Sequence, residues 1–102
     1  MISSQHTLTT ASKEIMSSSS RQGSEIINMF VTNTNASASK LVTIQQGTGS
    51  SKLTFVTFNI PPQVSIDIID GSSHLHIPHK KSIFATASAG TDVILTINYK
   101  DV

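Results

Sequence analysis

Apolar residues recur at every second position, or in short runs, through most of this 102-residue chain. From Glu25 onward, turn residues close each such segment after about 8 to 12 positions. A period of two places successive side chains on opposite faces of a β-strand, whereas a helix needs a period of about 3.6 residues. No segment of the sequence keeps the helical spacing. The pattern therefore predicts an all-β chain.

The expected strands lie between turns rich in Asn, Gly and Pro. In the clearest of them, Val93, Leu95, Ile97 and Tyr99 share one face. The expected strands cover residues 26–31, 41–44, 53–58, 64–68, 75–77, 82–86 and 93–99, with an Asp70-Gly71 turn between the fourth and the fifth. Short strands at this spacing are typical of a small two-sheet β-sandwich, either immunoglobulin-like or jelly-roll.

The first 24 residues have a different composition. Residues 17–23 are rich in Ser and have the composition of a flexible connector. Before them, residues 6–10 and 13–16 fit either short strands or an arm. We therefore predict an extended N-terminal arm and Ser-rich connector over residues 1–24, and a β-sandwich domain over residues 25–102. Such an arm is suited to pairing with a neighbouring subunit by strand addition.

The surface chemistry favours contact with other proteins. Only 13% of the residues are charged, against about 25% in a typical soluble domain, and the net charge is +1. Weak self-repulsion favours packing against neighbours, and a chain without cysteine has no disulfide to stabilise a thin core. The charge balance argues against nucleic acid as a partner. We expect no membrane span, no signal peptide, no cofactor and synthesis in a cytoplasm.

Three histidines are the candidates for a metal site. His74 and His76 share one face of a strand, and His79 follows Pro78. Neutral imidazole is the commonest metal ligand, so a small metal-dependent enzyme is one hypothesis. No acidic ligand set accompanies these histidines in the sequence, and we expect solvated or interface-facing side chains and no metal.

The other chemical motifs have structural explanations. Asp70 and Asp92 stand in turns, where a carboxylate bonds the local backbone, and no pair of acids has the pattern of a glycosidase. Residues 46–52 resemble a phosphate-binding loop but lack its Gly-Lys-Ser/Thr ending, so we expect a hairpin loop there. No Gly-x-Ser-x-Gly elbow is present. The sequence therefore predicts no catalytic residues.

One cationic cluster is a candidate interface. His79, Lys80 and Lys81 are consecutive, and Arg21 lies in the Ser-rich segment. These four side chains suit an acidic patch on a partner protein. The alternative for residues 79–81 is the solvated turn that any strand connection needs.

Three features of the sequence occur in a set order: an apolar strand with an Asn-Thr ending at 30–34, a Pro-containing turn before an alternating strand at 60–71, and two final strands at 83–99. Because of these features, the stretch from Asn28 to Val102 resembles short virion structural proteins of tailed bacteriophages. At His79-Lys80-Lys81 that family often has a Gly-Asp-type turn, so the sequence departs from it there.

This resemblance implies a many-copy virion component assembled in the host cytoplasm. It would be a capsid decoration or cement protein, or a neck or tail accessory protein. The implied partners are the major capsid protein or neck and tail proteins, together with copies of itself in a symmetric assembly. The resemblance carries no catalytic residue, so we expect no enzyme. The alternative is a carbohydrate- or host-surface-binding sandwich module, although such modules usually expose aromatic platforms and this chain has no Trp.

Overall fold

The computed structural model describes residues 1–69 and 74–102 in full, and over these residues the chain forms β-strands joined by turns. Residues 70–73, inside the sixth strand, are outside this description. The strands are β1 (Ile2–Leu8), β2 (Lys13–Ser17), β3 (Ser24–Asn33), β4 (Lys40–Gly47), β5 (Lys52–Ile60), β6 (Ser65–Ile77), β7 (Ser82–Ala87) and β8 (Val93–Asp101). The expected all-β sandwich is confirmed.

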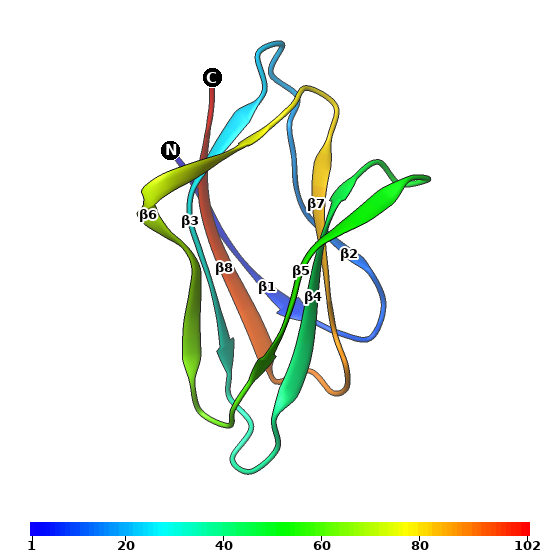
Figure 1. Cartoon of the computed structure of the whole chain (residues 1–102), viewed down its shortest axis with the longest axis vertical. Helices are drawn as coiled ribbons and strands as arrows, with labels where there is room; N and C mark the ends of the chain where they lie inside the picture. The colour runs from blue at the N-terminus through cyan, green and yellow to red at the C-terminus, as the bar shows by residue number, and fades with distance from the viewer.

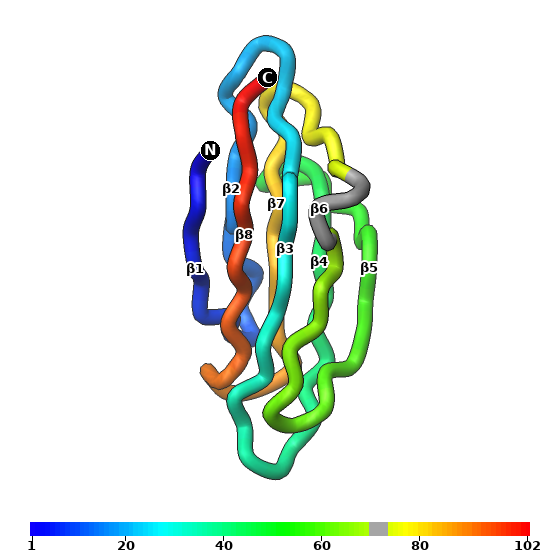
Figure 2. The backbone as a smooth tube through the Cα atoms, turned by 90° about the vertical axis from the view of Figure 1, so that its left-hand side faces the viewer, coloured from blue at the N-terminus to red at the C-terminus, as the bar shows by residue number. Residues whose placement is uncertain are grey.

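The strands form two antiparallel sheets, sheet A with the order β1-β8-β3-β6 and sheet B with the order β2-β7-β4-β5 (Figure 1, Figure 2). The first strand pairs with the last, the second with the seventh, the third with the sixth, and the fourth with the fifth. This nested pairing is the pattern of a jelly roll, and it differs from the immunoglobulin order. Of the two expected sandwich types, the jelly roll is the one observed.

The expected extended N-terminal arm is wrong. Residues 2–8 form β1, which pairs along its whole length with β8, and residues 13–17 form β2, which pairs with β7. The side chain of Leu8 is fully buried, as is nearly all of Ile15 and Met16. These residues supply one outer strand to each sheet because burying their apolar side chains outweighs the cost of ordering a polar segment.

The later strands lie where the alternation predicts them, with ends one to three residues longer in most cases. The difference is in β6, which spans both of the segments expected at 64–68 and 75–77. The predicted Asp70-Gly71 turn lies outside the described residues.

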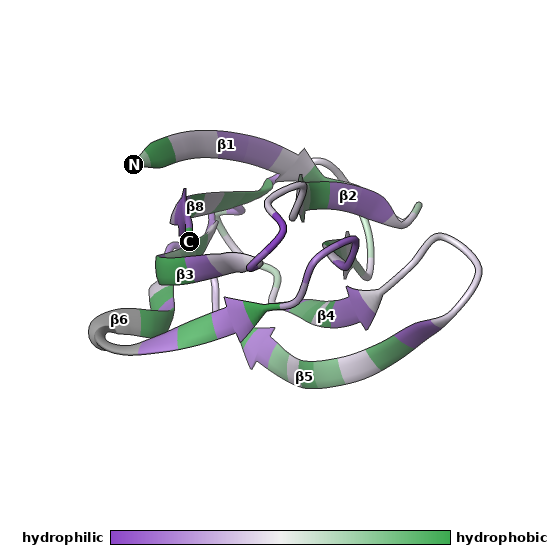
Figure 3. Cartoon of the chain, turned by 90° about the horizontal axis from the view of Figure 1, so that it is seen from above, coloured by the Kyte–Doolittle hydropathy of each residue, from purple (hydrophilic) through white to green (hydrophobic). Residues whose placement is uncertain are grey.

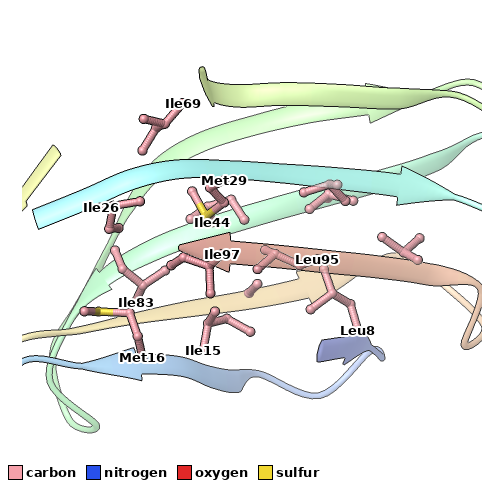
Figure 4. Close-up of a cluster of buried hydrophobic side chains, with 14 of the residues drawn as sticks. Leu8, Ile15, Met16, Ile26, Met29, Ile44, Ile69, Ile83, Leu95 and Ile97 are labelled. Atoms are coloured by element: carbon pink, nitrogen blue, oxygen red, sulfur yellow. The ribbon is translucent and has the colours of Figure 1, made fainter. Parts of the chain in front are cut away.

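The core lies between the two sheets, which Figure 3 shows from above. Its side chains are mainly aliphatic (Figure 4). Alternate residues point inward, as the β-strand period requires, so Leu95 and Ile97 of β8 are fully buried between more exposed neighbours. Each such side chain contributes about 2 kcal/mol to folding by leaving water. The fully buried set includes Leu8, Ile26, Met29, Val31, Val42, Ile44, Ile60, Ile77, Ile83, Val93, Leu95 and Ile97.

Antiparallel pairing sends successive loops to opposite ends of the sandwich. Loops 18–23, 48–51 and 78–81 lie at one end, the upper end of Figure 1, together with both chain termini. Loops 34–39, 61–64 and 88–92 lie at the other end. The predicted cationic residues therefore belong to one end of the molecule.

Candidate functional site

The candidate site is the cationic end, which we define as loops 18–23 and 78–81. Two backbone hydrogen bonds join the loops: Ser18 N donates to Lys81 O at 2.9 Å, and Lys80 N donates to Ser18 O at 2.8 Å. Val102 N donates to Gly23 O at 3.0 Å, which ties the first loop to the segment after β8. The Ser-rich segment is therefore fixed to two other parts of the chain at this end.

Serine side chains make several hydrogen bonds at this end of the molecule. Ser18 and Ser24 are buried, and their hydroxyl oxygens lie 2.9 Å apart. The Ser24 hydroxyl donates to the Asp101 carboxylate at 2.7 Å, and the Ser20 hydroxyl donates to Val102 O at 2.8 Å. Hydrogen bonding of this kind lets polar side chains occupy buried positions without an unpaired group.

The structure brings the four predicted interface residues to the same end. His79 Nδ1 lies 2.7 Å from the Ser20 carbonyl oxygen, and because a carbonyl only accepts, Nδ1 carries the donated proton. Arg21 follows Ser20 directly, and its side chain is exposed, as are those of His79, Lys80 and Lys81. Residues about 60 positions apart in the sequence thus lie in two bonded loops at one end of the molecule, with their side chains exposed.

Lys80 adopts a backbone conformation that favours glycine. Its φ is 66°, and Lys81 N donates to Pro78 O at 3.1 Å, so residues 78–81 form a type II turn with Lys80 at its third position. A side chain in this region costs about 1 kcal/mol. Gln63, at the opposite end of the sandwich, has the same strain at φ 58°.

Replacing Lys80 with glycine is expected to raise the free energy of unfolding by about 0.5 to 1 kcal/mol, because glycine adopts positive φ without a steric cost. Gln63→Gly is the matched control and is expected to give a similar gain. Urea denaturation of the two variants and the parent chain measures both effects. A loss of stability in Lys80→Gly, with a gain in Gln63→Gly, would show that the Lys80 side chain itself stabilises the fold.

The three candidate metal-binding histidines make separate contacts. His74 Nδ1 lies 3.5 Å from the Glu25 carboxylate, which also lies 3.5 Å from Lys100 Nζ. The ring of His76 packs so closely beside Gly23 that a Cβ added to this glycine would lie 2.8 Å from Nε2 of the ring. His79 bonds to Ser20. Within residues 1–69 and 74–102, no three His, Asp or Glu side chains gather as metal ligands.

The fourth histidine, His6, lies on β1. Burial lowers its pKa below the ordinary value, and the nearby charge of Lys13 lowers the pKa further, while a backbone hydrogen bond at Ile15 opposes both. Its Nε2 lies 3.0 Å from the Ser4 hydroxyl. His6 therefore belongs to the sheet edge and not to the cationic end.

A polar network at the opposite end was not predicted. Asn35 Nδ2 donates to Asp92 Oδ2 at 2.6 Å, and this hydrogen bond is the main reason why the pKa of Asp92 lies below its ordinary value, against a smaller opposing effect of desolvation. Lys40, which is 8% exposed, places Nζ 3.8 Å from the same carboxylate. Asp92 thus has the structural role expected of a turn acid, but it joins two loops and does more than cap its own turn.

Residues 46–52 form the hairpin connection that the sequence predicts in place of a phosphate loop. Thr48 N donates to Ser51 O at 2.8 Å, which closes the turn between β4 and β5. Beside it lies a depression of about 290 Å³, whose lining includes Gln46, Ser51, Leu53 and Phe55 together with Lys81 of the cationic end. Leu53 is 77% exposed and Phe55 is 40% exposed.

The exposed apolar surface on β5 was not predicted from the sequence. One signal for this surface was available in the sequence. Residues 53–66 include no charged residue, although the strand within them alternates polar and apolar residues. Such a stretch suits an outer strand that contacts another molecule, but it also suits a buried one.

Comparison of the chain with protein-family models, with curated proteins and with solved structures finds no match. In the described part of the chain, no helix has the length and apolar character that crossing a bilayer requires.

Proposed function

We propose that this chain is a structural virion protein of a tailed bacteriophage, which binds the capsid surface as a decoration or cement protein or forms part of the neck or tail. The observation that carries the proposal is the cationic end, where three of the chain's seven Lys and Arg residues project from two loops that are bonded to each other. The resemblance to small virion proteins supports it, as does the jelly-roll fold that many capsid domains use.

The cationic end suits a contact with an acidic surface on a capsid, neck or tail protein. Complementary charge increases the association rate and fixes orientation, and it weakens as salt screens the charges. The proposal assigns the chain no catalytic step. Its role is to occupy many equivalent sites on a symmetric particle, where repeated weak contacts give strong total binding.

Mass spectrometry of purified particles, from a phage that carries this reading frame, tests the proposal and is expected to find stoichiometric copies of the chain. Binding of the purified chain to particles lacking it is expected to weaken at least about ten-fold in Lys81→Glu, because a repelling charge replaces an attracting one. Lys13→Glu, an equal charge change at an exposed residue of β2, is the control and is expected to bind normally. Particles without the chain would overturn the proposal.

A second candidate function is binding of a carbohydrate or host surface. Phe55 favours it, because an exposed aromatic ring beside a depression lined with Gln46 and Ser51 offers one stacking face and polar groups. Reproducible binding on a glycan array that is lost in Phe55→Ala would support this function. Absence of binding by the parent chain would exclude it for the glycans tested.

A further inference from the structure

The two open sides of the sandwich differ in how well they cover the core. On one side, β1 and β2 are the outer strands, and their inward residues Leu8, Ile15 and Met16 are buried. On the other side, β5 and β6 are the outer strands, and although Ile60, Ile69 and Ile77 are buried, several of their other core-packed apolar residues remain partly exposed. The partly exposed residues on this side are Val56 and Phe58 of β5, Val64 of the loop between the strands, and Ile66, Ile68 and Leu75 of β6. Figure 1 looks onto this second side.

The inward orientation of the β5 residues follows from their register with β4. Val56 lies opposite Ile44, and Phe58 lies opposite Val42, and both β4 residues are fully buried. Directly opposed residues of an antiparallel pair point to the same face of the sheet. Val56 and Phe58 therefore belong to the core-facing side of sheet B, but no further strand of the same sheet covers their outer edge within the described residues.

The β5 edge lacks the charges that commonly prevent strand pairing. Protein edge strands are often protected by Lys, by inward charges, by Pro or by bulges. No charged residue occurs from Leu53 to Ile66, so β5 is uncharged after Lys52. The pairing of β5 with β4 has one register shift, between Ile44 and Gln45 of β4, which lies near the beginning of β5. Residues 56–60 of β5 pair regularly with β4.

We infer that β5 pairs antiparallel with β5 of a second copy of this chain, about a two-fold axis at Thr57. This register places Val56 of each copy opposite Phe58 of the other, and pairs of aromatic and β-branched residues stabilise neighbouring strands. Thr57 of one chain lies opposite Thr57 of the other, and its exposed side chain is on the outer face of the sheet. The two copies of sheet B become one continuous sheet.

Charge favours a second copy as the occupant. A two-fold axis at Thr57 brings the residues of β5 in one copy beside the same residues of β5 in the other, so a charged strand would repel its own copy. The stretch 53–66 has no charged residue and avoids this repulsion.

The inference rests on the proposed function in one respect, namely that the chain acts through contacts between subunits. The chain has no cysteine, so a single introduced cysteine reports the contact directly. Thr57→Cys is expected to form a covalent dimer on oxidation, because facing residues in an antiparallel pair are about 4.5 to 5.5 Å apart, within disulfide range. Thr7→Cys, an exposed threonine on the outer strand of the other side, is the control and is expected to stay monomeric.

Sedimentation equilibrium of the purified chain gives the second readout. We expect a reversible dimer in the parent chain, at least ten-fold weaker dimerisation in Thr57→Lys, and no change in Thr7→Lys. Circular dichroism establishes that each variant is folded. A parent chain that remains monomeric at about 100 µM, or a covalent dimer through Cys at position 7 in place of position 57, would overturn the inference. Dimerisation without binding to particles would instead overturn only the proposed function.

Discussion

Replacing Asn33 with alanine is expected to lower the free energy of unfolding by about 3 kcal/mol, because several buried polar groups lose their partner together. Asn33 is fully buried at the end of β3, and its side-chain NH2 group lies within hydrogen-bond distance of three carbonyl oxygens, Ala38 at 2.9 Å, Ile60 at 3.0 Å and Pro61 at 3.3 Å, so its two N–H groups share three acceptors. Its own oxygen accepts from Asn35 N at 3.0 Å. One side chain thus joins the β3–β4 loop to the end of β5.

Urea denaturation of Asn33→Ala measures this effect, with Asn59→Ala as the control. Asn59 lies exposed on β5, and its replacement is expected to change stability by less than about 0.5 kcal/mol. Asn33→Asp keeps the acceptor but replaces the donor with a carboxylate beside carbonyl oxygens, so it is expected to be at least as harmful at neutral pH. Equal stability of Asn33→Ala and Asn59→Ala would show that water replaces the amide without loss.

Gly47→Ala is expected to destabilise the chain by about 3 kcal/mol and to disturb the β4–β5 hairpin. Gly47 has a φ of 153°, and a Cβ there would overlap the carbonyl oxygen of Ser51, so the hairpin backbone must move to admit it. Such a shift would also displace Lys52, whose Nζ lies 4.3 Å from the centre of the Phe84 ring and 3.1 Å from the Ser12 hydroxyl. These contacts reach across sheet B to β7 and to the β1–β2 loop.

Gly49 in the same hairpin provides the matched control. A Cβ at Gly49 meets nothing within 4 Å, so Gly49→Ala is expected to be neutral or slightly stabilising. Thermal unfolding compares the two variants, and the expected loss for Gly47→Ala corresponds to a fall in Tm of about 15 °C. Similar melting of Gly47→Ala and Gly49→Ala would contradict the crowding that the structure shows at Gly47.

The strands after Glu25 were predictable because burial on one face imposes alternation on the sequence itself. Val93, Leu95 and Ile97 alternate with less buried residues, and this local pattern locates β8 without knowledge of its partners. The jelly-roll order was not predictable in the same way. It depends on β8 lying between β1 and β3, a pairing between segments far apart in the chain, whose local patterns fit the immunoglobulin order equally well.

The N-terminal strands were missed for a related reason. Within β1, Leu8 alone is buried, and the remaining residues are mostly Ser, Thr, Gln and His, so the segment carries little apolar signal of its own. Its order comes from the burial of Leu8 together with pairing along the edge of β8, and composition does not reveal that pairing. The pairing partner of β1 lies at the other end of the sequence, which explains why β1 was missed while strands with their own apolar alternation were predicted.

The candidate site was only partly visible in the sequence. Residues 79–81 were apparent as a run of cationic side chains, but the position of Arg21 depends on backbone bonds between Ser18 and the second loop. The role of Asn33 was equally hidden, because an Asn at the end of a strand has the ordinary appearance of a turn residue. Whether the cationic residues bind a partner stays a prediction.

The position of β8 has a consequence for how this protein is made. Sheet A cannot close until β8 enters between β1 and β3, and β8 leaves the ribosome after both of these neighbours. Incomplete chains therefore lack the strand that both neighbours need, and their apolar faces remain unprotected. Folding is delayed until synthesis of the domain is finished, so truncated products are excluded from any assembly that requires the folded surface.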